Sequence, residues 1–322
     1  MWSFQVGGMR VPGKWLGALC LALASSIWGG MYVVSKIVLA VMPAVTLVWM
    51  RYVLALAALL AVGLATRQPW RIPWRHIPLI VAIGAVGYGL SIWAQFRGTQ
   101  LTTAQMGSIV TSATPAFMVV FGRLILGEPV TWRRGISVCM ATLGVLMIVG
   151  VERVSAGQLR GGLILLLAAI SWALMSVLVK TLPSGYSSLV VTTYAIGVAT
   201  LVLTPRVLLQ GLYEPGLARP EIWGGIIFLG LISTAGAFVL WTRGLQLLDV
   251  GNGGLYFFFQ PLVGTALGWF VLREAVSWTF WVGAALIVVG VLLVVREGQR
   301  TTRDRRWDKV YTVLRGFFGG GI

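Results

Sequence analysis

The segment Arg97-Gly98-Thr99-Gln100-Leu101 recurs 146 positions later as Arg243-Gly244-Leu245-Gln246-Leu247. Five further residues recur on the same offset: Pro115, Gly122, Glu128, Trp132 and Gly144 return as Pro261, Gly268, Glu274, Trp278 and Gly290. Chance similarity between two apolar stretches would not keep arginine, glutamine, proline, glutamate and tryptophan in register. The chain therefore contains a duplicated unit.

The duplication extends toward the N-terminus of each copy. Trp28 and Lys36 recur as Trp172 and Lys180, on an offset of 144 positions. The two offsets differ by only two residues, so one small insertion in a connecting loop reconciles them.

The composition is that of a membrane protein. Of the 322 residues, 58% are hydrophobic and 11% are charged, and the mean hydropathy is +0.88. Such a chain has too few polar residues to cover the surface of a soluble domain. Apolar runs of about 20 residues, the length that crosses a bilayer as a helix, predict ten spans: 15–40, 46–65, 77–96, 102–126, 133–151, 160–182, 188–206, 222–246, 252–272 and 278–295.

Each copy of the duplicated unit holds five of these spans. Because five is odd, the second copy must enter the membrane in the opposite orientation to the first. We therefore expect an all-α polytopic membrane protein built from two inverted five-helix repeats. The expected organisation is a cytoplasmic N-terminal segment, two repeats and a basic cytoplasmic tail, at residues 1–14, 15–151, 152–296 and 297–322.

The net charge of +16 is unevenly distributed. Placing both termini in the cytoplasm puts most of the 25 lysines and arginines on that side, as the positive-inside rule favours, and the tail supplies many of them. The predicted location is a cell inner membrane. The tail has apolar residues at helical spacing between basic ones, which fits either a helix on the anionic inner leaflet or a solvated tail.

Motifs of enzymes and metal proteins are absent from the sequence. It has no G-x-x-x-x-G-K-[ST] loop, no Cys/His cluster and no G-x-S-x-G motif. The single histidine, His76, falls in a basic loop. We therefore expect no enzymatic activity, no cofactor, no metal and no nucleic-acid partner; the partners are a small-molecule substrate and the bilayer.

All nine acidic residues lie in loops, at span ends or in the tail: Glu128, Glu152, Glu214, Glu221, Asp249, Glu274, Glu297, Asp304 and Asp308. Proton-coupled carriers place a titratable group within the transport path. The pattern therefore favours a facilitator without obligatory proton coupling. Glu128 and Glu274 are expected to interact with the N-terminal amides of the helix that follows each of them.

Candidate site residues follow from helical spacing around the repeated tryptophans. Four-residue intervals align Trp28, Tyr32 and Lys36 on one face of span one, and Trp172, Ser176 and Lys180 on one face of span six. The tryptophans lie near mid-span, so two indole rings would form a midplane site with a cation toward each mouth. The alternative for the lysines is that they extend to the membrane interface.

Four further spans supply polar and aromatic residues at matching depths. The candidates there are Tyr88, Ser91, Ile92 and Gln95 on span three, Ser108 and Thr111 on span four, Phe238 and Trp241 on span eight, and Tyr256 and Gln260 on span nine. The alternative for the serines and threonines is hydrogen bonding between helices. Arg51, Arg97 and Arg243 are not expected to touch the substrate.

Pro115 and Pro261 occupy equivalent mid-span positions. A proline there leaves a backbone carbonyl unpaired and bends the helix, which lipid tolerates only at buried or cavity-lining positions. We interpret both as candidate hinges; a static packing kink is the alternative.

The repeated tryptophan and lysine, the R-G-x-Q-L segments, the mid-span prolines and the L-x-E-x-V turns together resemble the drug/metabolite transporter superfamily, EamA type, over residues 15–296. The aromatic richness and Trp28-Gly29-Gly30-Met31-Tyr32 resemble the YddG-like amino-acid exporters within it. The resemblance implies a ten-helix bundle around a central substrate cavity lined by spans one, three, four, six, eight and nine.

The function predicted on this basis is a secondary transporter that exports amino acids, aromatic or neutral ones above all, by alternating access. An exporter of other amphiphilic metabolites or drugs is an alternative within the transporters. A non-transporting membrane scaffold or a channel is an alternative from another class. The sequence leaves the oligomeric state open, and a monomer is compatible with it.

Overall fold

The computed structural model describes residues 5–6, 9–10, 13–102, 107, 110–111, 113–149, 156–183, 185–210, 217, 219–272, 278, 281–283, 285–290 and 293. The predicted site residue Ser108, the repeat junction, Glu274 and the basic tail lie outside these residues. Apart from one two-residue pair of strands, β1 (Gln5–Val6) and β2 (Met9–Arg10), the described elements are helices.

Among the residues that the structure describes, the first half has these helical elements: α1 (Gly13–Leu39), α2 (Ala44–Ala65), η1 (Trp74–His76), α3 (Ile77–Ala82), η2 (Ile83–Ser91), α4 (Ile92–Leu101), α6 (Thr114–Leu126) and α7 (Trp132–Val149). In the second half the described elements are α8 (Ala156–Thr181), α9 (Ser188–Gln210), α10 (Pro220–Ile227), η4 (Phe228–Gly236), α11 (Ala237–Leu247), α12 (Val250–Gly254), η5 (Leu255–Phe258) and α13 (Phe259–Leu272).

Six helical runs of the described chain are long and apolar enough to cross a membrane: Gly13–Leu39, Ala44–Ala65, Trp74–Leu101, Leu159–Thr181, Ser188–Gln210 and Pro220–Leu247. The other four predicted spans correspond to α6, α7, α12–η5–α13 and the helical stretch at 281–290, which are shorter or described in part. The prediction of an all-α polytopic membrane protein is confirmed. The third run extends beyond the predicted 77–96 because the helix continues through the exposed Arg97.

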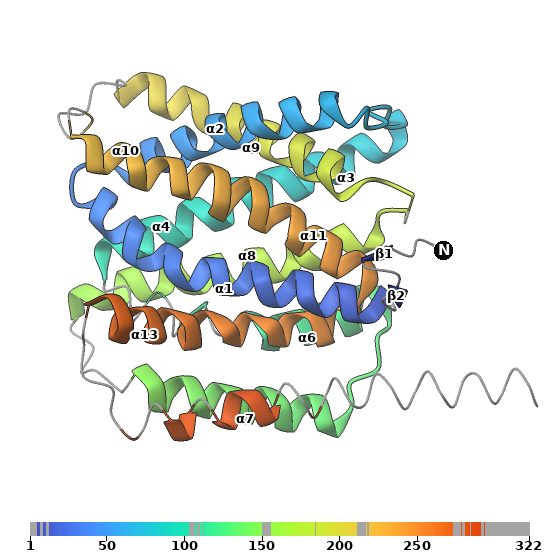
Figure 1. Cartoon of the computed structure of the whole chain (residues 1–322), viewed down its shortest axis with the longest axis vertical. Coiled ribbons are helices and arrows are strands. Elements are labelled where there is room, and N and C mark those ends of the chain that lie inside the picture. The colour runs from blue at the N-terminus through green and yellow to red at the C-terminus, as the bar shows by residue number, and fades with distance from the viewer. Residues whose placement is uncertain are drawn as a thin grey trace, which may run out of the picture.

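The two halves interlock through their first helices. α1 packs against α11 and α13 of the second half, and α8 packs against α4 and α6 of the first half. In Figure 1 α1 and α8 run through the centre of the molecule, with α2 and α9 on one side and α7 on the other. The core between the halves is therefore built from both copies.

The two central helices run in opposite directions. Gly17, near the start of α1, and Lys180, near the end of α8, both meet Leu248 after the end of α11. Lys36, near the end of α1, and Gly161, near the start of α8, both meet Thr102 after the end of α4. This crossed arrangement is the inverted relation between repeats that an odd number of spans requires.

Each half contains a nine-residue π-helix at the same place, η2 in the first and η4 in the second. The wider π turn leaves carbonyl groups in need of other donors, and such segments often occur at functional sites. Tyr52 Oη donates to the Tyr88 carbonyl in η2 at 2.6 Å, and Trp28 Nε1 donates to the Ser233 carbonyl in η4 at 3.0 Å. Both π-helices thus contribute to the aromatic core of the molecule.

Both repeated prolines lie in the first turn of a helix. Pro115 follows a turn at Ala113 and opens α6, and Pro261 follows the 3₁₀ helix η5 and lies at the start of α13. Proline has no N–H and clashes with the carbonyl four residues earlier, so it fits in the first turn of a helix and not in the helix interior. The two spans are therefore divided into segments at equivalent positions, while the hinge role remains a prediction.

Candidate functional site

An aromatic cluster occupies the contact between the two halves. The repeated tryptophans meet edge to face, with the Trp28 and Trp172 ring centroids 5.3 Å apart at 89°. Phe238 of α11 lies 5.8 Å from Trp28 and 5.5 Å from Trp172. Trp241 and Phe257 complete the group, 4.8 Å apart and 5.3 and 5.7 Å from Trp28. Edge-to-face and tilted contacts of this kind are favourable between rings.

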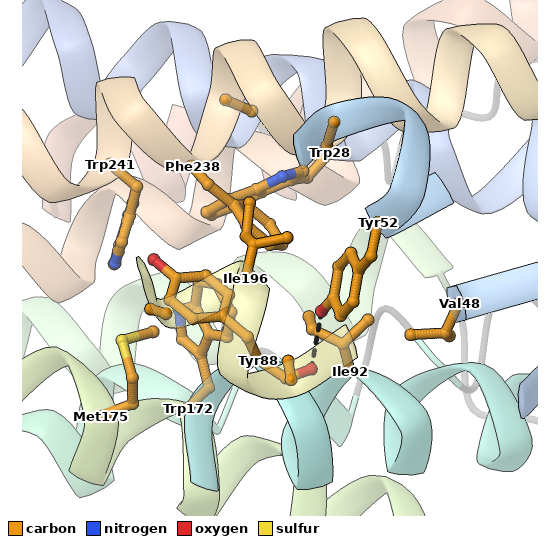
Figure 2. Packing of buried hydrophobic residues seen from close by; sticks show 14 of the residues in the cluster. Trp28, Val48, Tyr52, Tyr88, Ile92, Trp172, Met175, Ile196, Phe238 and Trp241 are labelled. Atoms are coloured by element: carbon orange, nitrogen blue, oxygen red, sulfur yellow. Dashed lines mark hydrogen bonds between the residues drawn. The ribbon is translucent and has the colours of Figure 1, made fainter. Parts of the chain in front are cut away.

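Figure 2 shows how these rings come together from distant parts of the chain. Trp28 and Phe238 lie side by side, and Trp172 and Tyr88 lie across from them. Tyr88 is 4.7 Å from Phe238 and 5.8 Å from Trp172. The prediction that the two tryptophans share one site therefore agrees with their placement.

A narrow pocket lies beside this cluster, and its free volume is only about 20 Å³. That volume is far below the range of about 300–1,000 Å³ found for small-molecule sites, so the side chains around the pocket must move apart before it can hold a substrate. Its walls come from both halves: Trp28, Met31, Ser91, Ile92, Gln95, Thr111, Thr114, Ala168, Ala169, Trp172, Phe238, Phe257 and Gln260. Eight of the predicted residues are among them: Trp28, Ser91, Ile92, Gln95, Thr111, Trp172, Phe238 and Gln260.

Five of the lining residues were not predicted from the sequence: Met31, Thr114, Ala168, Ala169 and Phe257. Met31 lies three residues after Trp28 and Ala168 lies four residues before Trp172, so longer helical stripes would have included both. Phe257 replaces the predicted Tyr256, whose ring instead stacks on Phe259 at 6.1 Å.

The two indole N–H groups differ in their hydrogen bonding. Trp28 Nε1 donates to the Ser233 carbonyl at 3.0 Å. Trp172 Nε1 is buried and has no hydrogen-bond partner within the described part of the chain. Because Trp172 lines the pocket, its N–H is available to a ligand acceptor.

A chain of hydrogen bonds supports the polar wall of the pocket. Gln95 Nε2 donates to Tyr32 Oη at 2.8 Å, and Tyr32 lies 2.8 Å from Thr111 Oγ1. Thr111 donates in turn to the Gly107 carbonyl at 2.7 Å, so the Tyr32 hydroxyl is the donor to Thr111. Tyr32 therefore positions Gln95 and Thr111 rather than lining the pocket itself.

Several other predicted polar residues hold the helices together. Ser91 Oγ donates to the Ala168 carbonyl at 2.8 Å, and Trp241 Nε1 donates to Ser176 Oγ at 3.3 Å. Ser176 itself donates to the Trp172 carbonyl at 2.9 Å. Ser176 and Trp241 thus stabilise the cluster from outside the pocket.

The repeated lysines cap helix ends. Lys36 Nζ donates to the carbonyls of Thr99 and Thr102 at 3.0 and 2.7 Å, at the end of α4. Lys180 Nζ donates to the carbonyls of Leu245 and Leu248 at 2.9 and 2.8 Å, at the end of α11. The last carbonyls of a helix lack backbone partners and carry the negative end of its dipole. Neither lysine lines the pocket, so the structure places both at the helix ends.

Glu128 closes one face of the molecule, where α1 begins. Its carboxylate accepts the backbone N–H groups of Val250 and Gly251 at 2.9 and 3.2 Å. Arg134 lies 3.5 Å from both Glu128 and Asp249. The expectation that Glu128 binds the amides of the following helix is wrong, because its amide partners belong to α12 in the other half.

The described residues contain no group of three or more His, Cys, Asp or Glu side chains that could hold a metal ion. His76 hydrogen-bonds Tyr186 Oη at 2.6 Å at the edge of the bundle. The candidate site that the described residues form is the pocket, whose walls carry rings and a few hydrogen-bonding groups.

Comparison with known proteins identifies the architecture. A profile of the EamA-like transporter family matches residues 15–150 and again residues 159–296. An "Uncharacterized transporter" of Archaeoglobus fulgidus is 27% identical over 287 residues, covering 87% of this chain and 97% of the relative. A "Probable terminal-alkyne amino-acid exporter" of Streptantibioticus cattleyicolor is 27% identical over 258 residues, covering 79% of this chain and 83% of the relative.

A solved crystal structure has the same fold. It superposes with a TM-score of 0.74 at 21% sequence identity, over 88% of this chain and 98% of that one. The structural superposition and the family match over both repeats therefore support the same assignment. This chain belongs to the EamA-like transporter family, within the drug/metabolite transporter superfamily.

Proposed function

We propose that this transporter exports amino acids with aromatic or other apolar side chains across the cell inner membrane. The observation that carries the proposal is the ring-lined pocket between the halves, where Trp172 keeps an uncommitted N–H beside Phe238 and Phe257. Apolar walls with few polar groups are typical of small-molecule sites, and rings contact an apolar side chain over a large area. The similarity to a relative named an amino-acid exporter supports the same class of substrate.

The mechanism we propose is alternating access. The pocket lies between two inverted halves, and the rings around it touch, so a ligand must separate them to enter. On the face where α1 begins, Glu128 ties the α6–α7 turn to α12 of the other half. Breaking that contact would open this face, which we assign to the cytoplasm with both chain termini.

Transport is proposed to proceed without obligatory proton coupling. The acidic residues that the structure describes are Glu128, Glu221 and Asp249, and each lies at a helix end or in a turn. A carboxylate that carries a proton across the membrane is expected within the transport path. The described path offers hydroxyl, amide and indole groups instead.

Counterflow in proteoliposomes tests the proposal. Vesicles loaded with unlabelled phenylalanine should accumulate external labelled phenylalanine, with saturation, while protein-free vesicles should not. Leucine and tryptophan should compete, and sugars should not. A steady ionic conductance would indicate a channel, a stoichiometric proton current would contradict the facilitator mechanism, and absence of exchange with every amino acid would refute the proposed substrate class.

A further inference from the structure

Arg51 is a buried cation within the second span, about two turns after the start of α2. Its side chain is 0% exposed in α2. The guanidinium donates to Thr234 Oγ1 at 2.6 Å and to Ser233 Oγ at 3.2 Å, both in η4, and lies 3.6 Å from Met31 Sδ. Its carbon also lies 4.9 Å from the Phe96 ring centroid and 5.9 Å from that of Phe238. All of these partners are neutral.

No carboxylate compensates this charge within the part of the chain that the structure describes. The ion pairs there join Arg134 to Glu128 and to Asp249. An arginine remains protonated in proteins, and an ionised side chain inside a membrane protein is costly and marks a functional site. Each guanidinium nitrogen of Arg51 has one neutral hydrogen-bond partner, a hydroxyl or the Met31 sulfur, and none of these partners opposes the positive charge.

The duplicated framework does not require a cation at this position. α2 begins at Ala44 and α9 begins at Ser188, the same offset of 144 that relates the repeated tryptophans. On that offset Arg51 corresponds to Ala195, which is fully buried. A position that one copy fills with alanine packs without a guanidinium, so the charge serves something specific to the first half.

Arg51 lies directly behind the pocket. Met31 and Phe238 contact the guanidinium on one side and line the pocket on the other. Trp172 lines the same pocket, its N–H has no partner among the described residues, and its ring centroid lies 5.5 Å from that of Phe238. The cavity therefore combines a positive potential with a free hydrogen-bond donor, and the chemical group that matches both is a carboxylate.

We propose that Arg51 determines specificity by selecting ligands that carry a carboxylate and rejecting amines that lack one. The proposal rests on the proposed function in that it takes this pocket as the substrate site. Arg51 acts across Met31 and Phe238 as an electrostatic positioning residue. In a region of low effective dielectric, one such charge is sufficient to raise the affinity for a carboxylate at least about tenfold over that for a matched ligand without one.

Ligand-dependent melting of the purified protein in lipid nanodiscs tests this with matched probes. L-Phenylalanine, its methyl ester, phenylacetate and phenethylamine share one ring and differ in their charged groups. The wild-type protein should bind the two carboxylates at least about tenfold more tightly than the ester and the amine. The Arg51→Met and Arg51→Gln variants should reduce this ratio to near one, and Gln keeps a donor for Thr234 and Ser233.

Two control variants separate charge from structure. Arg51→Lys retains the charge and should retain most of the selection. Arg97→Met removes an equivalent charge from the exposed end of α4, where Arg97 hydrogen-bonds Gln100, and should leave the ratio unchanged. A purely structural role for Arg51 would lower the melting temperature in its variants without moving the ratio.

The proposal is overturned if wild-type protein binds phenethylamine or the ester as tightly as the acids. It is equally overturned if either charge-free Arg51 variant folds and keeps the wild-type ratio. If phenylalanine is not transported but phenylacetate still outcompetes phenethylamine, amino-acid export is refuted and the role of Arg51 stands. If phenylalanine is transported without this selection, amino-acid export stands and the role of Arg51 is refuted.

Discussion

The first and sixth spans are equivalent helices of the two repeats, but their tryptophans differ in hydrogen bonding. Both keep a mid-span tryptophan and a lysine eight residues later, and both lysines cap the end of a helix in the same way. The tryptophans differ: the Trp28 N–H is bonded to the Ser233 carbonyl, while the Trp172 N–H has no partner among the described residues. The shared contacts maintain the framework, and the difference supports the proposed ligand site beside Trp172.

Removing the ring of Trp172 should have the largest effect on transport. Trp172→Ala deletes a wall of the pocket and its free N–H, so we expect counterflow to fall at least about tenfold, since several ring contacts of about 1 kcal/mol each are lost. Trp74→Ala, at a ring that is 83% exposed, is the matched control. Fluorescence-detected size-exclusion chromatography must show folded protein for both variants. Unchanged kinetics in folded Trp172→Ala would remove this residue from the site.

Adding a methyl group to Gly29, where α1 crosses α13, should destabilise the protein. The equivalent position of α8 already holds an alanine. A Cβ at Gly29 of α1 would lie 2.6 Å from the Gln260 carbonyl oxygen of α13, whereas the equivalent position in α8 already carries Ala173. Gly29→Ala should therefore lower the free energy of unfolding by about 1–3 kcal/mol through overpacking, measured as a drop in melting temperature.

Gly135→Ala provides the control for that measurement. Nothing lies within 4 Å of a Cβ at Gly135 of α7, so this substitution should leave stability unchanged or raise it slightly through helix propensity. Equal melting temperatures for the Gly29 and Gly135 variants would show that α1 and α13 do not approach as closely as the structure indicates.

The two lysines should respond alike, because they make the same contacts. Lys36→Met and Lys180→Met each remove two charge-assisted hydrogen bonds to helix-end carbonyls, and each should cost about 1–2 kcal/mol of unfolding free energy. Substrate affinity should change little in either variant, since neither lysine lines the pocket. A selective loss of affinity with normal stability would instead assign the lysines to substrate carboxylate binding.

The sequence predicted the helical framework and eight of the residues that line the pocket, because polar residues in register are informative in an apolar chain. Trp28 and Trp172 could be paired from their repetition alone. The contacts of Lys36 could not be predicted, because they depend on where α4 ends against α1. The same holds for Glu128, whose partners lie 122 and 123 residues away in the other half.

Helical phase explains why Phe257, and not Tyr256, lines the pocket. The prediction assumed an α-helix through span nine, but residues 255–258 form the 3₁₀ helix η5. A 3₁₀ helix turns about 120° per residue instead of about 100°, so it rotates each side chain relative to an α-helical stripe. Phe257 consequently faces the pocket, and Tyr256 faces Phe259. No residue pattern in the sequence marks that change.

Two conservative substitutions, Trp28→Phe and Trp172→Phe, test the comparison most directly. Both variants are measured for stability and for phenylalanine affinity. Trp28→Phe leaves the Ser233 carbonyl unpaired, so it should cost about 1–3 kcal/mol of unfolding free energy. Trp172→Phe breaks no hydrogen bond within the described chain, so the protein should melt almost as the wild type does while binding phenylalanine several-fold more weakly. If Trp172→Phe instead destabilises the protein as Trp28→Phe does and leaves affinity intact, the pocket between the halves is not the substrate site.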